Sequence, residues 1–339
     1  MHTGFKKVKI TLLILLVILI ISGAALAAAM RSSAHTLRVL IVGDSIGEGA
    51  GASDPSLKWY KYLIPYMKDA YGVKLDITNV SMGGNSSYAG YTRVMELEDG
   101  ENYDLAIICY GENDQVEGFS LYYESILWAI CDKYPSCRLI TILESSQQDY
   151  TEKIRTIESL SAHYGADVAD TIAAFKDSKR PYEELCDDGT HPNDAGQMIY
   201  YETVKAVMDA IYSQENMPEV QRPDPLNPEV AGFKNFSYYP AERFEKTEGY
   251  AYELEMKLPA GRLGIDYTTV KGVNMITLYA DEKKICEKEI GWNNDFTLDF
   301  IEVMEDRCEV NSKIRIEFSS KEQMEAFHGI IVNEYEVSG

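Results

Sequence analysis

The chain has 339 residues, of which 45% are hydrophobic and 25% charged. This composition excludes a disordered chain, a collagen-like repeat and a small disulfide-stapled module, because it supplies ample apolar surface for a packed core, and the length predicts two domains. The 54 acidic residues outnumber the 32 Lys and Arg to give a net charge of −22. Nucleic acid is therefore not an expected partner, since binding to phosphates requires a basic surface.

Residues 1–31 begin with a basic flank and then contain no charged residue from Ile10 to Met30. A basic flank before about 20 apolar residues is typical of a membrane span and also of a secretory signal. The length favours an uncleaved membrane anchor, whereas the small residues before and at Ala27 favour a signal peptide cleaved after Ala27. Because basic residues stay in the cytoplasm in both cases, we expect the rest of the chain to be extracytoplasmic, either membrane-anchored or secreted.

Residues 36–213 alternate short apolar runs with longer amphipathic stretches. The apolar runs predict strands that are buried on both faces, and the amphipathic stretches predict helices between them. The expected strands are 37–42, 75–80, 105–109 and 139–143, and the expected helices are near 57–71, 119–134, 151–164 and 194–213. This order predicts a three-layer α/β/α, flavodoxin-like domain with a parallel sheet. Ligands of such sheets bind beyond the carboxyl ends of the strands, which is where we look for a site.

Residues 214–230 contain four prolines and no hydrophobic period, which predicts a linker. After it the hydrophobic period changes to two, over residues 252–258, 296–300 and 314–318. Alternation of this kind is typical of half-buried antiparallel strands, so residues 231–339 are expected to form a β-sandwich or jelly roll.

Six cysteines form an even set in a chain that we expect to be exported, which allows up to three disulfides. The pairs favoured are Cys131 with Cys137 and Cys286 with Cys308. The alternative is that most of the cysteines are free thiols buried as small apolar side chains. Since no C-x-x-C pair occurs, no zinc site is predicted.

Four short polar motifs follow the predicted strands or precede the last helix. Ser45 lies in a Gly-Asp-Ser turn directly after the first strand, where a serine is by itself as typical of a helix N-cap as of a nucleophile. Gly83 and Gly84 follow the second strand, Asn113 follows the third, and the segment 188–193 (DGTHPN) stands before the final helix. Because parallel strands end at one edge, these motifs are expected to meet there.

The four motifs, in this order, resemble the blocks of SGNH hydrolases, the GDSL esterase superfamily, over residues 36–213. The resemblance implies that Ser45 is the nucleophile, His191 the general base and Asp188 the group that orients His191. It also implies an oxyanion hole made by the backbone N–H groups of Ser45 and Gly84 and the side-chain amide of Asn113, with Gly83 as the alternative to Gly84. No metal and no cofactor are implied.

Trp59 follows the loop after the serine motif, and we expect it to line the substrate pocket. An exported SGNH domain joined to a β-rich domain is similar to carbohydrate esterases that remove acetyl groups from polysaccharides. The prediction is therefore a serine ester hydrolase acting on a small acyl ester or an O-acetylated glycan, such as a cell-wall polysaccharide. Two alternatives stay open: an O-acyltransferase that modifies a cell-wall polymer with the same triad, and a catalytically inactive, membrane-tethered binding protein.

Overall fold

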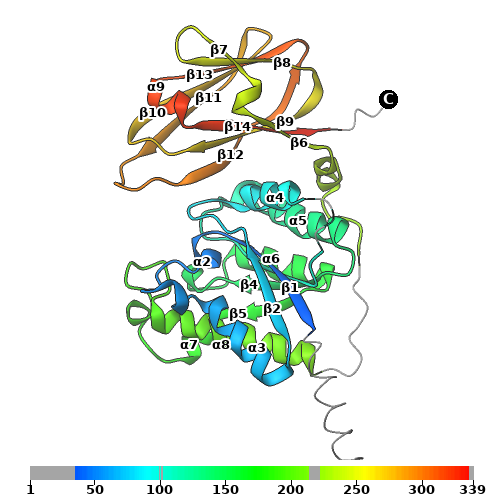
Figure 1. Ribbon diagram of the computed structural model, residues 1–339, viewed down its shortest axis with the longest axis vertical. Helices are drawn as coiled ribbons and strands as arrows, with labels where there is room; N and C mark the ends of the chain where they lie inside the picture. The colour runs from blue at the N-terminus through cyan, green and yellow to red at the C-terminus, as the bar shows by residue number, and fades with distance from the viewer. Residues whose placement is uncertain (1–34, 99, 101, 214–221, 336–339) are drawn as a thin grey trace, which may run out of the picture.

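The computed structural model describes residues 35–98, 100, 102–213 and 222–335. The signal or anchor predicted over residues 1–31 lies outside the described residues, as does the first part of the predicted linker. Within the described ranges, no helix combines the length and apolar character that a membrane crossing requires. An α/β domain and a β-sandwich stand one on the other (Figure 1).

The α/β domain is built on a five-stranded parallel sheet of order β2-β1-β3-β4-β5. The strands are β1 (Thr36–Gly43), β2 (Lys74–Asn79), β3 (Leu105–Cys109), β4 (Arg138–Leu143) and β5 (Asp167–Asp170). Every residue of the central strand β3 is buried, as expected when helices cover both faces of a sheet. The four predicted strands are confirmed. Strand β5 was not predicted, because its four residues include two acids and no apolar run.

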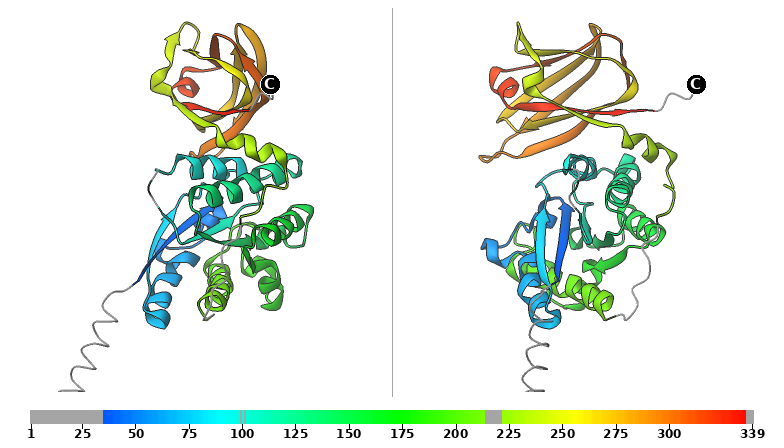
Figure 2. Two further views of the ribbon diagram at one scale, coloured as in Figure 1. Left: turned by 90° about the vertical axis from the view of Figure 1, so that its right-hand side faces the viewer. Right: turned by 45° about the vertical axis from the view of Figure 1, so that its right-hand side comes forward.

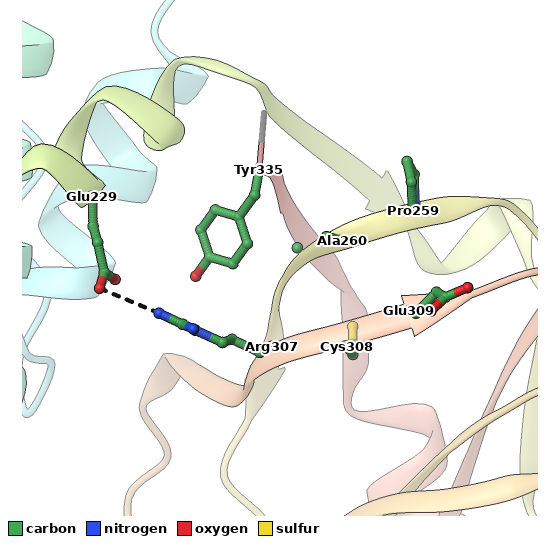
Figure 3. Close-up of a pocket in the computed structure, with 8 residues that line it drawn as sticks. Glu229, Pro259, Ala260, Arg307, Cys308, Glu309 and Tyr335 are labelled. Atoms are coloured by element: carbon green, nitrogen blue, oxygen red, sulfur yellow. Dashed lines mark hydrogen bonds and ion pairs between the residues drawn. The ribbon is translucent and has the colours of Figure 1, made fainter. Parts of the chain in front are cut away.

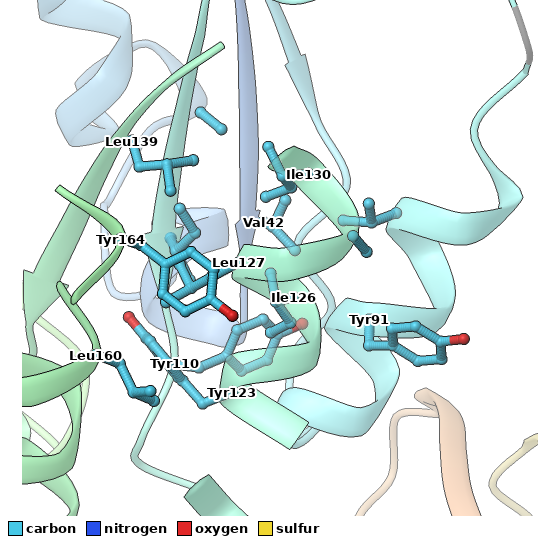
Figure 4. Close-up of a cluster of buried hydrophobic side chains, with 14 of the residues drawn as sticks. Val42, Tyr91, Tyr110, Tyr123, Ile126, Leu127, Ile130, Leu139, Leu160 and Tyr164 are labelled. Atoms are coloured by element: carbon cyan, nitrogen blue, oxygen red, sulfur yellow. The ribbon is translucent and has the colours of Figure 1, made fainter. Parts of the chain in front are cut away.

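Helices cover both faces of this sheet, which confirms the predicted three layers. One face carries α4 (Ser87–Glu96), α5 (Val116–Lys133) and α6 (Glu152–Tyr164), and the other carries α3 (Trp59–Tyr71), α7 (Thr171–Asp177) and α8 (Asp194–Tyr212). Figure 4 shows side chains of α5 and α6 meeting those of β1 and β4 in the core of the first face. Helix α4 was not predicted, because its buried residues include serine, glycine and threonine and form no apolar run. The shorter elements are α2 (Ser45–Glu48), η1 (Pro55–Leu57), η2 (Ser145–Gln147) and η3 (Tyr182–Glu184).

The second domain is the predicted antiparallel β-sandwich. Its two sheets have the orders β11-β10-β13-β8-β7 and β12-β9-β14-β6 and enclose a separate apolar core. The strands are β6 (Phe236–Pro240), β7 (Glu245–Thr247), β8 (Ala251–Glu255), β9 (Leu258–Thr268), β10 (Gly272–Ala280), β11 (Lys283–Trp292), β12 (Asp299–Val310), β13 (Lys313–Phe318) and β14 (Phe327–Glu334). The helical elements of this domain are η5 (Ala241–Arg243) and α9 (Lys321–Glu325).

Two of the predicted strands differ from those observed, whereas the strand predicted at 314–318 is confirmed as β13. The alternation over 252–258 belongs to two strands, since β8 ends at Glu255 and β9 begins at Leu258. The predicted strand 296–300 is wrong at residues 296–298, which belong to the loop 293–298 between β11 and β12, whereas residues 299 and 300 begin β12. The reason is local: the ring of Phe296 packs on Trp292 at the end of β11, with ring centroids 5.4 Å apart, and stays exposed to solvent.

The domain junction is a packed interface. The described end of the predicted linker forms the 3-10 helix η4 (Pro228–Lys234), which contains the predicted boundary at residue 231 and buries Val230 and Phe233. Phe233 packs edge-on against Tyr91 of α4, and the guanidinium of Arg262 of β9 lies 4.6 Å from the centre of its ring. Figure 2 shows the sandwich resting on α4 and α5 in both views. The two domains are thus joined through buried side chains.

All six cysteines lie in the described residues and are free thiols. Neither pair favoured by the sequence, Cys131 with Cys137 or Cys286 with Cys308, is bridged. Five of the six are buried, which agrees with the alternative interpretation of small apolar core residues.

Candidate active site

Ser45 lies on the tight turn at the carboxyl end of β1, at the first position of helix α2. Asp44 caps this helix: its Oδ1 accepts the Ile46 N–H at 2.8 Å, while its own N–H donates to the Cys109 carbonyl at 3.1 Å. Glycine is required before the turn, because a Cβ atom on Gly43 would lie 2.7 Å from the Cys109 carbonyl oxygen. The serine hydroxyl is thereby held at the carboxyl edge of the parallel sheet, partly open to solvent.

His191 and Asp188 reach this serine from the loop before α8. The distance from Ser45 Oγ to His191 Nε2 is 2.8 Å, and that from His191 Nδ1 to Asp188 Oδ2 is 2.6 Å. Asp188 Oδ1 also accepts the backbone N–H groups of Thr190 and His191 at 2.9 and 2.8 Å. Desolvation alone would raise the pKa of Asp188, but the hydrogen bonds from the His191 ring and from these two N–H groups outweigh it and lower the pKa to about 2. An ionised Asp188 favours the tautomer with Nδ1 protonated, which leaves Nε2 to accept the serine proton.

The histidine loop is attached to the serine loop by Gln197, which the sequence analysis did not identify. This fully buried side chain of α8 donates to the carbonyls of Pro192 and Ala50, both at 2.9 Å, and accepts the Trp59 N–H at 2.9 Å. A buried glutamine in a helix leaves no signal in the sequence except its place six residues after the histidine. Its role is decided by the packing of α8 against α3.

Trp59 does not line the pocket, so the expectation for this residue is wrong. Its side chain is completely buried in the core beneath helix α2, and the indole N–H donates to the Ile46 carbonyl at 3.1 Å. The reason is that Trp59 begins α3 and points toward the sheet. Its indole N–H thereby stabilises the turn that carries Ser45.

Gly83, Gly84 and Asn113 surround the same edge of the sheet. A Cβ atom on Gly83 would lie 3.7 Å from Ser45 Cβ, and Gly84 has a φ of +75°, a conformation that favours glycine. The Asn113 amide nitrogen donates to the Asn85 carbonyl at 3.2 Å and lies 3.4 Å from Asp44 Oδ2. The structure therefore brings all the site residues expected from the sequence together, except Trp59.

The loop that carries Asn113 is held by two charged residues that the sequence analysis missed. Lys153 of α6 donates to the carbonyls of Gly111, Glu112 and Asp114, the last at 2.9 Å. From the opposite side, Glu144 Oε2 accepts the Glu112 N–H at 2.8 Å. Together they fix the loop through its backbone.

The carboxyl groups beneath this site are deeply buried. Burial is the main reason why the pKa of Glu144 lies well above its usual range, and the charge of Asp44 raises it further. Burial likewise raises the pKa of Asp44, and the charges of Asp114 and Glu112 add to the shift. The raised pKa of Asp44 favours its neutral form beside Asn113, which limits negative charge at the place where an oxyanion would form.

The β-sandwich forms one wall of the site. A Cβ atom on Gly84 would lie 2.9 Å from Phe300 Cζ and 3.1 Å from Leu298 Cδ1. Beside these contacts a pocket of about 390 Å³ opens between the domains, lined by Gly84 and Asn113 on one side and by the Lys288–Glu302 ion pair of β11 and β12 on the other. The second domain therefore lies against the glycine turn beside Ser45.

A larger pocket lies elsewhere. It has a volume of about 490 Å³ and is lined by residues of the sandwich and η4, including Glu229, Arg307 and Tyr335 (Figure 3). None of the residues at the carboxyl edge of the parallel sheet takes part in its lining. The site is therefore identified by its chemistry and not by cavity size.

Ser45, His191 and Asp188 form a hydrogen-bonded triad at the carboxyl edge of the parallel sheet. Such a triad is typical of a serine hydrolase. Residues 41–199 match the model of the GDSL-like Lipase/Acylhydrolase family, so this part of the chain is a domain of that family. The protein is a carboxylic ester hydrolase.

Solved structures match both domains. A two-domain esterase (CEX) active on acetylated mannans, crystallised with mannopentaose, superposes with a TM-score of 0.71 at 16% identity, covering 93% of this chain and 95% of that chain. Axe2, an acetylxylan esterase from Geobacillus stearothermophilus, matches 52% of this chain and 95% of its own with a TM-score of 0.45 and 16% identity. A comparison with curated proteins gave no significant match. At 16% identity, the similarity to the two-domain esterase establishes the fold alone.

Proposed function

We propose that the protein is an SGNH-type esterase that removes acetyl groups from an O-acetylated carbohydrate. The observation that carries the proposal is the hydrogen-bonded sequence of Ser45, His191 and Asp188, with distances of 2.8 and 2.6 Å. It lies in a two-domain chain whose fold matches 95% of the length of an esterase described as active on acetylated mannans.

In the proposed mechanism, Ser45 is the nucleophile and His191 is the general base. His191 takes the hydroxyl proton through Nε2 as Ser45 Oγ attacks the ester carbonyl, and it then protonates the leaving sugar hydroxyl. Asp188 stabilises the imidazolium through Nδ1–H. Water then attacks the acyl carbonyl while His191 takes its proton; the bond between Ser45 Oγ and the acyl carbon breaks, His191 returns the proton to Oγ, and acetic acid leaves. No metal or cofactor takes part in these steps.

The oxyanion hole in this proposal consists of the backbone N–H groups of Ser45 and Gly84 and the amide of Asn113. The Asn113 amide is held by the Asn85 carbonyl at 3.2 Å and by a longer contact of 3.4 Å to Asp44 Oδ2; in the proposed reaction the oxyanion replaces Asp44 as the acceptor of the second N–H. The preference for a short acyl group is inferred from Leu298 and Phe300, because their side chains lie against the glycine pair and limit the space there.

The place of action is also a proposal. We infer that the enzyme acts outside the cytoplasm, because its N-terminal basic flank and apolar run have the pattern of a signal or anchor. Fractionation of cells that produce the full chain tests this: recovery of the enzyme in the cytoplasm, with its N-terminus intact and no membrane association, would contradict it.

The decisive experiment compares the wild type with Ser45→Ala on a panel of esters. Acetyl esters should be cleaved faster than long-chain esters, and acetylated mannan and xylan should release acetate. Ser45→Ala should lose this activity while its melting temperature stays close to that of the wild type. Undiminished hydrolysis by the variant would overturn the proposed mechanism, and transfer of the acetyl group to a sugar acceptor in preference to water would instead identify an acyltransferase.

A further inference from the structure

We propose that Asn85 is a positioning residue that makes strand β12 of the β-sandwich a structural part of the oxyanion hole. On this inference, the rate of acyl transfer depends on the contact between the two domains at this one side chain. The inference rests on the proposed function, since it concerns the same reaction.

The side chain of Asn85 joins the glycine turn to the edge strand of the second domain. Its amide nitrogen donates to the carbonyls of Asp299 at 2.7 Å and Gly83 at 3.0 Å, and its Oδ1 accepts the Ile301 N–H at 2.9 Å. Asn85 is 1% exposed. It thus pairs with two alternate residues of β12 as a neighbouring strand would, and it satisfies backbone groups on the outer edge of the four-stranded sheet.

The backbone of Asn85 adjoins two of the proposed oxyanion donors. Its carbonyl accepts the Asn113 amide at 3.2 Å, and its N–H donates to the Met82 carbonyl at 3.3 Å. The preceding residue is Gly84, whose N–H is a proposed oxyanion donor. Asn85 therefore contacts the sandwich with its side chain, holds the Asn113 amide with its carbonyl and follows Gly84 directly in the glycine turn.

Strand β12 also contacts the glycine turn directly through Phe300, which limits the movement of Gly84. The ring of Phe300 lies so close to Gly84 that a Cβ atom there would be 2.9 Å from Phe300 Cζ. Phe300 is flanked in sequence by the two residues that bind the Asn85 side chain. The peptide of Gly84 is consequently held between the aromatic ring and the amide anchor.

Other buried contacts hold the two domains together without Asn85. Tyr91 donates to the Phe233 carbonyl and accepts from the Asn333 amide at 2.9 Å, and the Tyr122 hydroxyl of α5 donates to Asp306 of β12 at 3.2 Å. These contacts lie away from the glycine turn. Loss of the Asn85 amide should therefore leave the sandwich docked but free the turn, and a displacement of about 1 Å at a reacting centre is enough to cost about 100-fold in rate.

The test compares Asn85→Ala with Tyr91→Phe in the full-length chain, using an acetyl ester substrate. Tyr91→Phe is the matched control, because it removes a buried hydroxyl from the same interface at a distance from the site. We expect Asn85→Ala to lower kcat by about 10- to 100-fold with little change in KM, since the lost interaction acts in the transition state. Tyr91→Phe should keep wild-type kcat even if its melting temperature falls.

A second variant guards against failure of Asn85→Ala to fold. Phe300→Leu keeps an apolar side chain on β12 but removes the ring over Gly84, and it should also lower kcat. Wild-type kcat in Asn85→Ala, or in Phe300→Leu if the first variant does not fold, would overturn the inference. Equal losses of kcat in Asn85→Ala and Tyr91→Phe would overturn it too, because they would indicate a general effect of the interface. Retained activity in Ser45→Ala is a separate result, which contradicts the proposed function instead.

Discussion

The replacement of Glu144 by Gln tests whether the carboxyl group beneath the active site is neutral in the folded protein. Glu144 is completely buried at the end of β4, where its Oε1 accepts the Cys109 thiol at 3.2 Å and its Oε2 accepts the Glu112 N–H. Burial raises the pKa of this carboxyl, and the charge of Asp44 adds to the shift. Glutamine has nearly the same shape, keeps an acceptor for the Glu112 N–H and cannot ionise.

The magnitude follows from proton linkage. In the unfolded chain Glu144 ionises near the ordinary pKa of about 4.3, whereas in the folded protein it keeps its proton to a higher pH. Between these two pKa values the folded state binds one more proton, so the free energy of unfolding falls by about 1.4 kcal/mol for each unit of rising pH. The stabilising contribution of the carboxyl is complete at low pH and is lost as pH rises. The variant lacks this loss, so its stability relative to the wild type should rise between pH 5 and pH 7, by about 1.4 kcal/mol for each pH unit over which the folded wild type keeps the proton.

The assay is urea unfolding of both proteins at pH 5, 6 and 7. Glu253→Gln in the sandwich is the matched control, because hydrogen bonds from Arg315 and Lys313 lower the pKa of Glu253. The stability due to Glu253 is present above the unfolded pKa and lost only as pH falls below it, so its difference from the wild type should stay constant from pH 5 to 7. A constant difference for Glu144→Gln over the same range would refute the reasoning, since it would mean that Glu144 is ionised in the folded protein.

Three further substitutions test the supports of the site. Lys153→Met removes the ammonium that binds three carbonyls of the Asn113 loop, and it should lower kcat for an acetyl ester by about 10- to 100-fold while Lys153→Arg recovers part of the rate. Trp59→Phe leaves the buried Ile46 carbonyl without its indole donor and should lower the free energy of unfolding by about 1–3 kcal/mol in a denaturant titration, with KM unchanged because the ring does not touch substrate. Gly84→Ala should lose most of its kcat, since the residue has a φ of +75° and a Cβ atom would meet an aromatic ring of β12 at 2.9 Å; a rate equal to that of the wild type would show that the turn can relax.

Much of the fold and of the candidate site could be predicted from local sequence. Apolar runs such as 105–109 are long enough to specify buried strands, and the order of strands and helices limits the topology to a parallel sheet with crossovers. The strands of a parallel sheet end at one edge, and the motifs that contain Ser45, Asn113 and His191 each stand at a strand end or before the last helix. Their meeting was therefore predictable without any knowledge of side-chain contacts.

The tertiary structure alone decided which buried side chains support that site. Trp59, Gln197 and Glu144 occupy positions whose neighbours come from distant parts of the chain, so their burial and their partners depend on how the helices pack. Asn85 acquires its partners on β12 only when the two domains are docked, because hydrogen bonds across more than 200 residues depend on the arrangement of complete sheets and not on any local pattern.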